Sequence, residues 1–124
     1  MAMVSPSSRK GAAGEQTAVE HLLGEGYTVL ERNFRVRGGE IDVVALDGEV
    51  LCFVEVRTRQ NADHGEPVET VGRAKQRRLV TAARHYLGRH EQDREIRFDV
   101  IGIVLEPEPR IQLVRGAFEP GWAC

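Results

Sequence analysis

The chain of 124 residues has little cysteine, few aromatic side chains and no long apolar run. Its two cysteines, Cys52 and Cys124, lack metal-ligand spacing and a secretory context, so we expect a core thiol and a tail thiol rather than a disulfide or a zinc site. The longest apolar runs, 50–54 and 100–105, are far shorter than the roughly 18 residues of a membrane span. Residues 1–8 do not resemble a secretory signal, which favours a cytoplasmic protein without membrane contact.

The composition, with 41% hydrophobic and 29% charged residues, is typical of a single globular domain. We predict a flexible leader at 1–10, the domain at 11–118 and a tail at 119–124. The net charge of −2 gives no support for a general polyanion binder. Residues 71–90, however, contain six Lys and Arg and no acid. This segment either faces phosphates or forms a solvated helix face balanced by neighbouring acids.

The apolar periodicity predicts a helix, three strands, a second helix and two strands. The first helix spans 8–24, with Ser8 as N-cap, and the second runs from a Thr70 cap to about Leu87. The strands are expected at 27–34, 40–46, 50–58, 96–105 and 111–118. Apolar residues on both faces of the second and third strands indicate an α/β fold in which helices cover both sides of the sheet.

Some polar residues fall where a helix should be apolar. Glu15 is centred on the apolar face of the first helix, where it either partners a core arginine or backbone amides or binds a cation. Lys75 and Gln76 lie within the apolar arc of the second helix, near its start. Lys75 is either a cleft residue or a side chain whose stem covers apolar surface. Three cations share the opposite side of this helix: Arg73, Arg77 and Arg84.

A register argument brings several charged residues together. With Asp47-Gly48 as a two-residue type I′ loop, Asp42 falls opposite Phe53 and diagonal to Glu55. One sheet face then carries four charged residues: Glu40, Asp42, Glu55 and Arg57. Carboxylates so close together need a compensating cation, which is either Arg57 or a hard divalent ion such as Mg²⁺ or Mn²⁺. A surface ion-pair cluster is the alternative.

Six separated motifs occur along the chain: Gly14-Glu15, Arg32-Asn33, 39–42, 53–59, 75–78 and 97–100. Together they resemble the bacterial YraN family of uncharacterised proteins. That family is assigned to the restriction-endonuclease-like, PD-(D/E)XK fold and is similar to archaeal Holliday-junction resolvases. The resemblance covers 11–118. It implies a three-layer αβα core with a mixed sheet in the order αβββαβ, followed here by an extra C-terminal strand.

The resemblance also implies a metal site and a reaction. Asp42 and Glu55 would bind Mg²⁺ or Mn²⁺, helped by the carbonyl of Val56 and by Glu15. The ion would lower the pKa of a bound water and neutralise charge on the scissile phosphate. The implied reaction is phosphodiester hydrolysis.

The sequence departs from the family pattern at Arg57, where a lysine is usual. An arginine holds a phosphate or orients water, but it cannot act as a base near neutral pH. Lys75 would supply an amine instead, with Gln76 contacting substrate or water.

Two hypotheses follow from these residues. The first is a Mg²⁺-dependent, structure-selective DNA endonuclease that acts on branched DNA, with homodimer formation left open. Its phosphate contacts would be Arg73, Arg77 and Arg84. The second is a noncatalytic module that binds nucleic acid or a partner and has lost turnover through Arg57. The first is favoured. A third, purely structural interpretation has to explain why Glu15, Asp42, Glu55 and Lys75 converge from four segments, which an ordinary core avoids.

Overall fold

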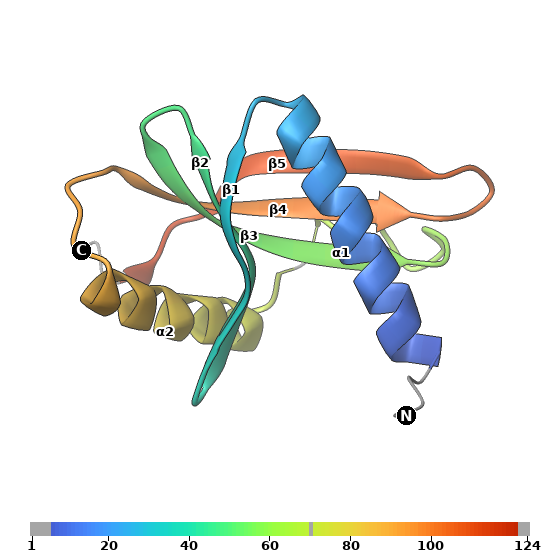
Figure 1. Ribbon diagram of the computed structural model, residues 1–124. Helices are drawn as coiled ribbons and strands as arrows, with labels where there is room; N and C mark the ends of the chain where they lie inside the picture. Colours follow the sequence, from blue (N-terminus) through green and yellow to red (C-terminus); the bar gives the residue numbers. More distant parts are fainter. Residues whose placement is uncertain (1–5, 70, 122–124) are drawn as a thin grey trace, which may run out of the picture.

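The computed structural model describes residues 6–69 and 71–121, with side chains from residue 13 onward. In chain order the elements are α1 (Pro6–Gly24), β1 (Thr28–Val36), β2 (Gly39–Asp47), β3 (Val50–Arg59), α2 (Arg73–Arg89), β4 (Ile96–Val104) and β5 (Arg110–Phe118) (Figure 1). Helix, strands, helix and strands follow one another as the periodicity predicts. Neither helix of the described part combines the length and the apolar character needed to cross a membrane.

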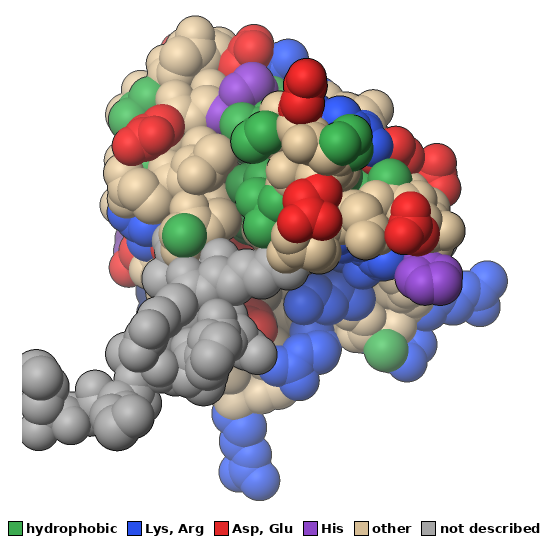
Figure 2. Space-filling model, turned by 90° about the vertical axis from the view of Figure 1, so that its right-hand side faces the viewer, with side chains coloured by type: hydrophobic (Ala, Val, Ile, Leu, Met, Phe, Trp, Pro, Cys, Tyr) green, Lys and Arg blue, Asp and Glu red, His purple; other side chains and the backbone are tan. Residues whose placement is uncertain are grey.

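The strands form one mixed sheet in the order β1-β2-β3-β4-β5. All neighbours pair antiparallel except β3 and β4, which are parallel and are connected through α2. The parallel pair makes β3 and β4 end at the same edge of the molecule. This edge faces the viewer in Figure 2, where Lys and Arg side chains gather over the lower part of the surface and most acidic ones over the upper part.

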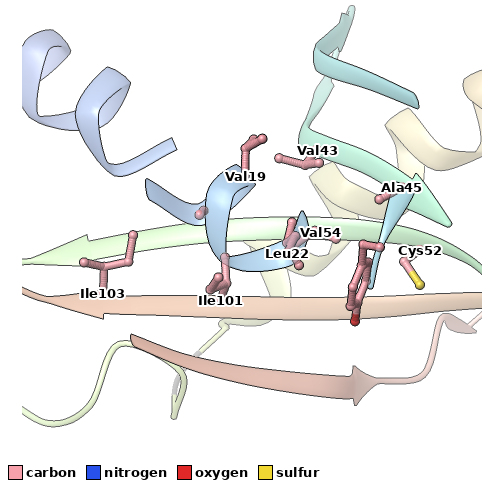
Figure 3. Packing of buried hydrophobic residues seen from close by; sticks show 10 residues of the cluster. Val19, Leu22, Val43, Ala45, Cys52, Val54, Ile101 and Ile103 are labelled. Atoms are coloured by element: carbon pink, nitrogen blue, oxygen red, sulfur yellow. The ribbon is translucent and has the colours of Figure 1, made fainter. Parts of the chain in front are cut away.

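The core has two halves, one on each face of the sheet. On the first face, Leu22 of α1 packs against Val43, Val54 and Ile101 (Figure 3). On the second face, Leu79, Ala82 and Tyr86 of α2 pack against a set of strand residues: Phe34, Ile41, Val44, Leu51, Phe53 and Phe98. The three-layer αβα architecture predicted from the sequence is therefore confirmed. Cys52 is fully buried, as expected of a core thiol, whereas Cys124 lies outside the described residues.

Both helices begin elsewhere than the capping signals predict. Helix α1 starts at Pro6, so the prediction of Ser8 as N-cap is wrong. Residues 1–5 lie outside the described part. Helix α2 starts at Arg73 with Gly72 in the N-cap position, which makes no side-chain capping bond. The predicted cap Thr70 lies outside the described residues.

The predicted pairing of β2 with β3 has the right faces but the wrong partners. Asp47 pairs with Val50, so the two-residue loop is Gly48-Glu49 rather than Asp47-Gly48. Gly48 has φ +60°, which suits the first central position of a type II′ turn, and such a turn needs positive φ only there. The register therefore moves by two residues, which keeps every side chain on its predicted face. Asp42 then falls opposite Glu55 instead of Phe53.

The β1–β2 hairpin bends away from the sheet and crosses α2 (Figure 1). Asn33 has φ +55°, in the left-handed region that side chains other than glycine rarely adopt. Beyond this bend the hairpin packs closely on the helix at Gly39, where a Cβ atom would come within 2.2 Å of the Arg78 carbonyl oxygen. The hairpin tip therefore packs against the middle of α2, at residues 78–82.

Candidate functional site

Two carboxyl groups meet where β2 and β3 separate toward the bent hairpin. Asp42 and Glu55 come one step beyond the paired residues Val43 and Val54. The two carboxyl groups are close enough for each to change the pKa of the other. The backbone of β3 holds the Asp42 carboxyl group, because the Val56 amide donates a hydrogen bond to Asp42 Oδ2 at 2.8 Å. Glu55 is only 4% exposed and Asp42 is half-buried, so the pair is more enclosed than a surface ion-pair cluster would be.

Burial and mutual repulsion determine the protonation of this pair. Desolvation, followed by the charge of Asp42, raises the pKa of Glu55 to about 8. Desolvation also raises the pKa of Asp42, against the hydrogen bond from Val56. Near neutral pH the pair thus retains a proton, because the pKa of Glu55 lies above 7. A site that retains a proton in this way is suited to exchange it for a metal cation.

Lys75 approaches the pair from the first turn of α2. Its Nζ lies 3.5 Å from Glu55 Oε1, and 43% of its side chain is exposed while that of Glu55 is 5% exposed. The ammonium group therefore stands between the carboxyl groups and solvent. Its charge counteracts the rise in the pKa of Glu55. The structure thus brings together Asp42, Glu55 and Lys75, which the sequence analysis placed in one candidate site.

Glu15 has different partners from those that the resemblance implies. Its Oε1 accepts hydrogen bonds from Arg32 Nε at 3.0 Å and from Asn33 Nδ2 at 2.8 Å. In β1, Arg32 pairs with Val43 and Phe34 pairs with Ile41, so Asn33 lies opposite Asp42 of β2. Across residues 6–69 and 71–121, His, Cys, Asp and Glu form no group of three that could hold a metal ion. Glu15 therefore ties α1 to β1 next to the carboxyl pair, through an exposed arginine rather than the core arginine that was one of the predicted partners.

The remaining candidate residues lie around this centre. Arg57 is half-buried two residues beyond Glu55, opposite Gly102 of β4. The Gln76 side-chain amide donates to the Val71 carbonyl at 2.8 Å, which ties it to the segment before α2. Glu40, predicted on the face of the carboxylates, pairs with Arg35 at 3.4 Å. Of these residues, Arg57 shares a face of β3 with Glu55, whereas Gln76 and Glu40 have partners outside the carboxyl pair.

The outer face of α2 carries the predicted phosphate contacts. A groove of about 540 Å³ runs between this helix and the segment after β5. Arg73, Arg77 and Arg84 all line this groove, together with Gln76 and Thr81. The helical count therefore grouped these three arginines correctly on one side of α2.

A second polar cluster lies toward the opposite end of the sheet. The Asp99 side chain is fully buried and accepts hydrogen bonds from Tyr27 Oη, Arg97 Nε and the Gly116 amide at 2.8–2.9 Å. Arg97 continues the network to Asp47 at 2.8 Å. Every buried side-chain polar atom of the described residues has a partner. This cluster explains the 97–100 motif as a structural network that ties β4 to β5 and to the start of β1.

Fold and site define a small three-layer α/β domain with a carboxyl pair at one end of its mixed sheet. A model of the Uncharacterised protein family UPF0102 matches residues 14–103. The chain belongs to this family, which confirms the resemblance noted from the motifs. It is 47% identical to a UPF0102 protein of Symbiobacterium thermophilum over 90% of this chain and 98% of the relative. A UPF0102 protein of Myxococcus xanthus is 44% identical over 98% of this chain and 99% of the relative.

Proposed function

We propose that this protein is a Mg²⁺- or Mn²⁺-dependent endonuclease of the restriction-endonuclease-like type that hydrolyses phosphodiester bonds in branched DNA. The observation that carries the proposal is the Asp42–Glu55 pair, in which Glu55 is buried and Asp42 half-buried, with Lys75 at its mouth. A structural core avoids placing a second acid beside a buried one, because an acid removed from water costs free energy unless it is paired. A divalent ion would offset that cost by replacing the retained proton.

The donor atoms fit a hard divalent ion. Asp42 and Glu55 offer carboxylate oxygens from adjacent strands, and the Val56 carbonyl is the third donor that the resemblance implies. The Val56 amide already holds one oxygen of Asp42, so this ligand is oriented before any ion binds. When bound, the ion would supply Lewis-acid stabilisation of negative charge on the phosphoryl group.

The cationic residues then have distinct roles. Lys75, partly exposed at the mouth, neutralises a phosphate oxygen that enters the site. Arg57, two residues beyond Glu55 on β3, holds a second phosphate oxygen, since its guanidinium group keeps its proton. Gln76 and Val71 fix the start of α2 and so set the position of Lys75. The arginines of the α2 groove bind phosphates further along the DNA.

A noncatalytic DNA-binding module is the second candidate function. Arg57 in place of lysine favours it, as does the pairing of Glu15 with Arg32 and Asn33 instead of with the carboxyl pair. Such a module would retain the basic α2 groove and bind DNA without cutting it. The two functions differ in turnover alone.

A cleavage assay separates them. The protein is incubated with linear, flapped and four-way-junction DNA in Mg²⁺, in Mn²⁺ and in EDTA. The endonuclease predicts strand scission of at least one branched form in either metal and none in EDTA. DNA binding without scission in any metal would identify the binding module instead.

A further inference from the structure

The tip of the β1–β2 hairpin, residues 35–40 and hereafter the hairpin arm, exposes two further arginines. Arg35 has 70% of its side chain exposed, and Arg37 is also exposed. Glu40 is the single acid of the arm, and it pairs with Arg35 at 3.4 Å. The arm therefore carries a net positive charge at its end, where Figure 1 shows it reaching beyond α2.

The arm is held against α2. The Gly39 backbone approaches α2 so closely that an added Cβ atom would lie 2.2 Å from the Arg78 carbonyl oxygen and 3.0 Å from the Ala82 nitrogen. Phe34 and Ile41, on either side of the arm, are buried in the α2 half of the core. A charge on this arm consequently has a fixed position relative to the helix, which lowers the entropic cost of using it in binding.

The arm adjoins the α2 groove, whose lining holds three arginines and one acid, Glu119. An added Cβ atom on Gly38 would lie 3.9 Å from the side chain of Thr81, and Thr81 lines the groove. Arg78, whose backbone carbonyl oxygen faces Gly39, has an exposed side chain. The exposed cations of this surface are all arginines: Arg35, Arg37, Arg73, Arg77, Arg78 and Arg84. Guanidinium groups bind phosphate oxygens in a bidentate manner, so this composition suits a phosphodiester backbone.

We propose that the hairpin arm is a second DNA-binding element, which contacts the phosphates of the same duplex that lies along α2. This inference rests on the proposed function, because it places DNA at Asp42 and Glu55. Three residues lie between Gly38 and Asp42, and the four extended steps span about 13 Å at most, at roughly 3.3 Å per residue. At about 3.4 Å of helix axis per base pair, the arm contacts the duplex within about four base pairs of the carboxyl pair.

The salt dependence of binding tests the arm. Affinity for a 20-base-pair duplex is measured by fluorescence anisotropy over a range of salt concentrations in EDTA. Each phosphate contact contributes about one unit to the slope of log affinity against log salt. Arg37→Ala should lower that slope by about one, and the double variant Arg35→Ala/Arg37→Ala by about two. Arg37→Lys should restore it, since the charge is retained.

Arg94→Ala is the matched control. It removes one arginine, paired with Glu49 at 3.1 Å, just before the first residue of β4 and so at the other end of the sheet. Its slope should equal that of the wild type, and circular dichroism checks that each variant is folded. An unchanged slope in the double variant would overturn the proposal. Equal competition by polyglutamate would also overturn it, in favour of an acidic protein partner.

Failure of the arm and failure of the nuclease are distinguishable. If the wild type cleaves branched DNA but the arm variants bind it with an unchanged salt slope, the arm inference is wrong and the proposed function stands. If the wild type cleaves no DNA but the salt slope falls in the arm variants, the arm inference stands and the protein is the noncatalytic DNA-binding module.

Discussion

Asp42 and Glu55 face each other across β2 and β3, and each carboxyl group changes the pKa of the other. The pair is next to the point at which Asn33 bends β1, and Lys75 covers its open side. Two adjacent acids in this position make the metal-free protein sensitive to their protonation. The stability of the protein and its chemistry are therefore linked through the same two residues.

The pH dependence of stability tests this link. The pKa of Glu55 is about 8 in the folded protein and near its ordinary value in the unfolded chain, so the folded state holds the proton more tightly. The resulting stabilisation is complete below the ordinary pKa and is lost as pH rises through 8. In EDTA, the free energy of unfolding should fall between pH 5 and pH 9. Glu55→Gln should flatten this decline and should exceed the wild type in stability above pH 8.

Urea denaturation at several pH values measures the effect. Glu49→Gln is the control, because this side chain is 97% exposed and should leave the profile unchanged. A Glu55→Gln profile that follows the wild type at every pH would show that Glu55 does not titrate as described.

The packing of the hairpin arm on α2 predicts a steric effect at Gly39. An alanine Cβ atom would lie 2.2 Å from the Arg78 carbonyl oxygen, and this backbone atom cannot move without shifting the helix. Gly39→Ala should lower the free energy of unfolding by about 1–3 kcal/mol. Gly24→Ala is the matched control and should not meet this clash, because nothing lies within 4 Å of a Cβ atom added there. Equal stability of the two variants in urea denaturation would contradict the close approach.

The Asp99 network predicts a large loss of stability far from the candidate site. Asp99→Asn keeps the shape of the side chain but removes the charge that faces Arg97 at 2.8 Å. Breaking a buried pair on one side costs about 3 kcal/mol or more. The midpoint of urea unfolding should therefore fall sharply, while DNA affinity of the folded variant stays that of the wild type. A midpoint within error of the wild type would show that the network contributes little.

The two basic residues near the carboxyl pair should differ in their effect on turnover. Arg57→Lys should preserve or raise the cleavage rate, because a lysine also holds a phosphate oxygen. Lys75→Ala should lower the rate by about 10²–10³-fold with DNA affinity unchanged, since it removes stabilisation of charge at the reacting group. Single-turnover rates on branched DNA measure both. An unaffected Lys75→Ala would leave Lys75 as a helix residue whose stem covers apolar surface.

The sequence predicts the fold well where periodicity and turn chemistry act locally. The mixture of helical and alternating patterns gives all seven elements, with ends that differ from the structure by at most three residues. The Asp47-Gly48 pair predicts the hairpin, but the type of turn decides the register, and Gly48 occupies the first central position rather than the second. A shift of two residues preserves the faces, so the candidate site survives the error.

The contacts between distant segments could not be predicted in this way. Glu15 is identified by its place on the helix, but its partners Arg32 and Asn33 depend on a bend of β1 at a left-handed asparagine. Periodicity does not encode that bend. The hairpin arm was missed for the same reason, because Gly38-Gly39 indicates a turn without indicating what it packs against. The close contact of Gly39 with α2 exists only in the folded chain.

The most direct measurement is the single-turnover cleavage rate of branched DNA by Asp42→Asn in saturating Mn²⁺, compared with the wild type and with Glu49→Gln. If Asp42 and Glu55 hold the ion that supports hydrolysis, the wild type and Glu49→Gln cleave at the same rate. Asp42→Asn should then bind the DNA normally but cut it at least about a hundred-fold more slowly, because a metal ligand is lost. Equal cleavage by wild type and Asp42→Asn, or no cleavage by the wild type, would contradict the account.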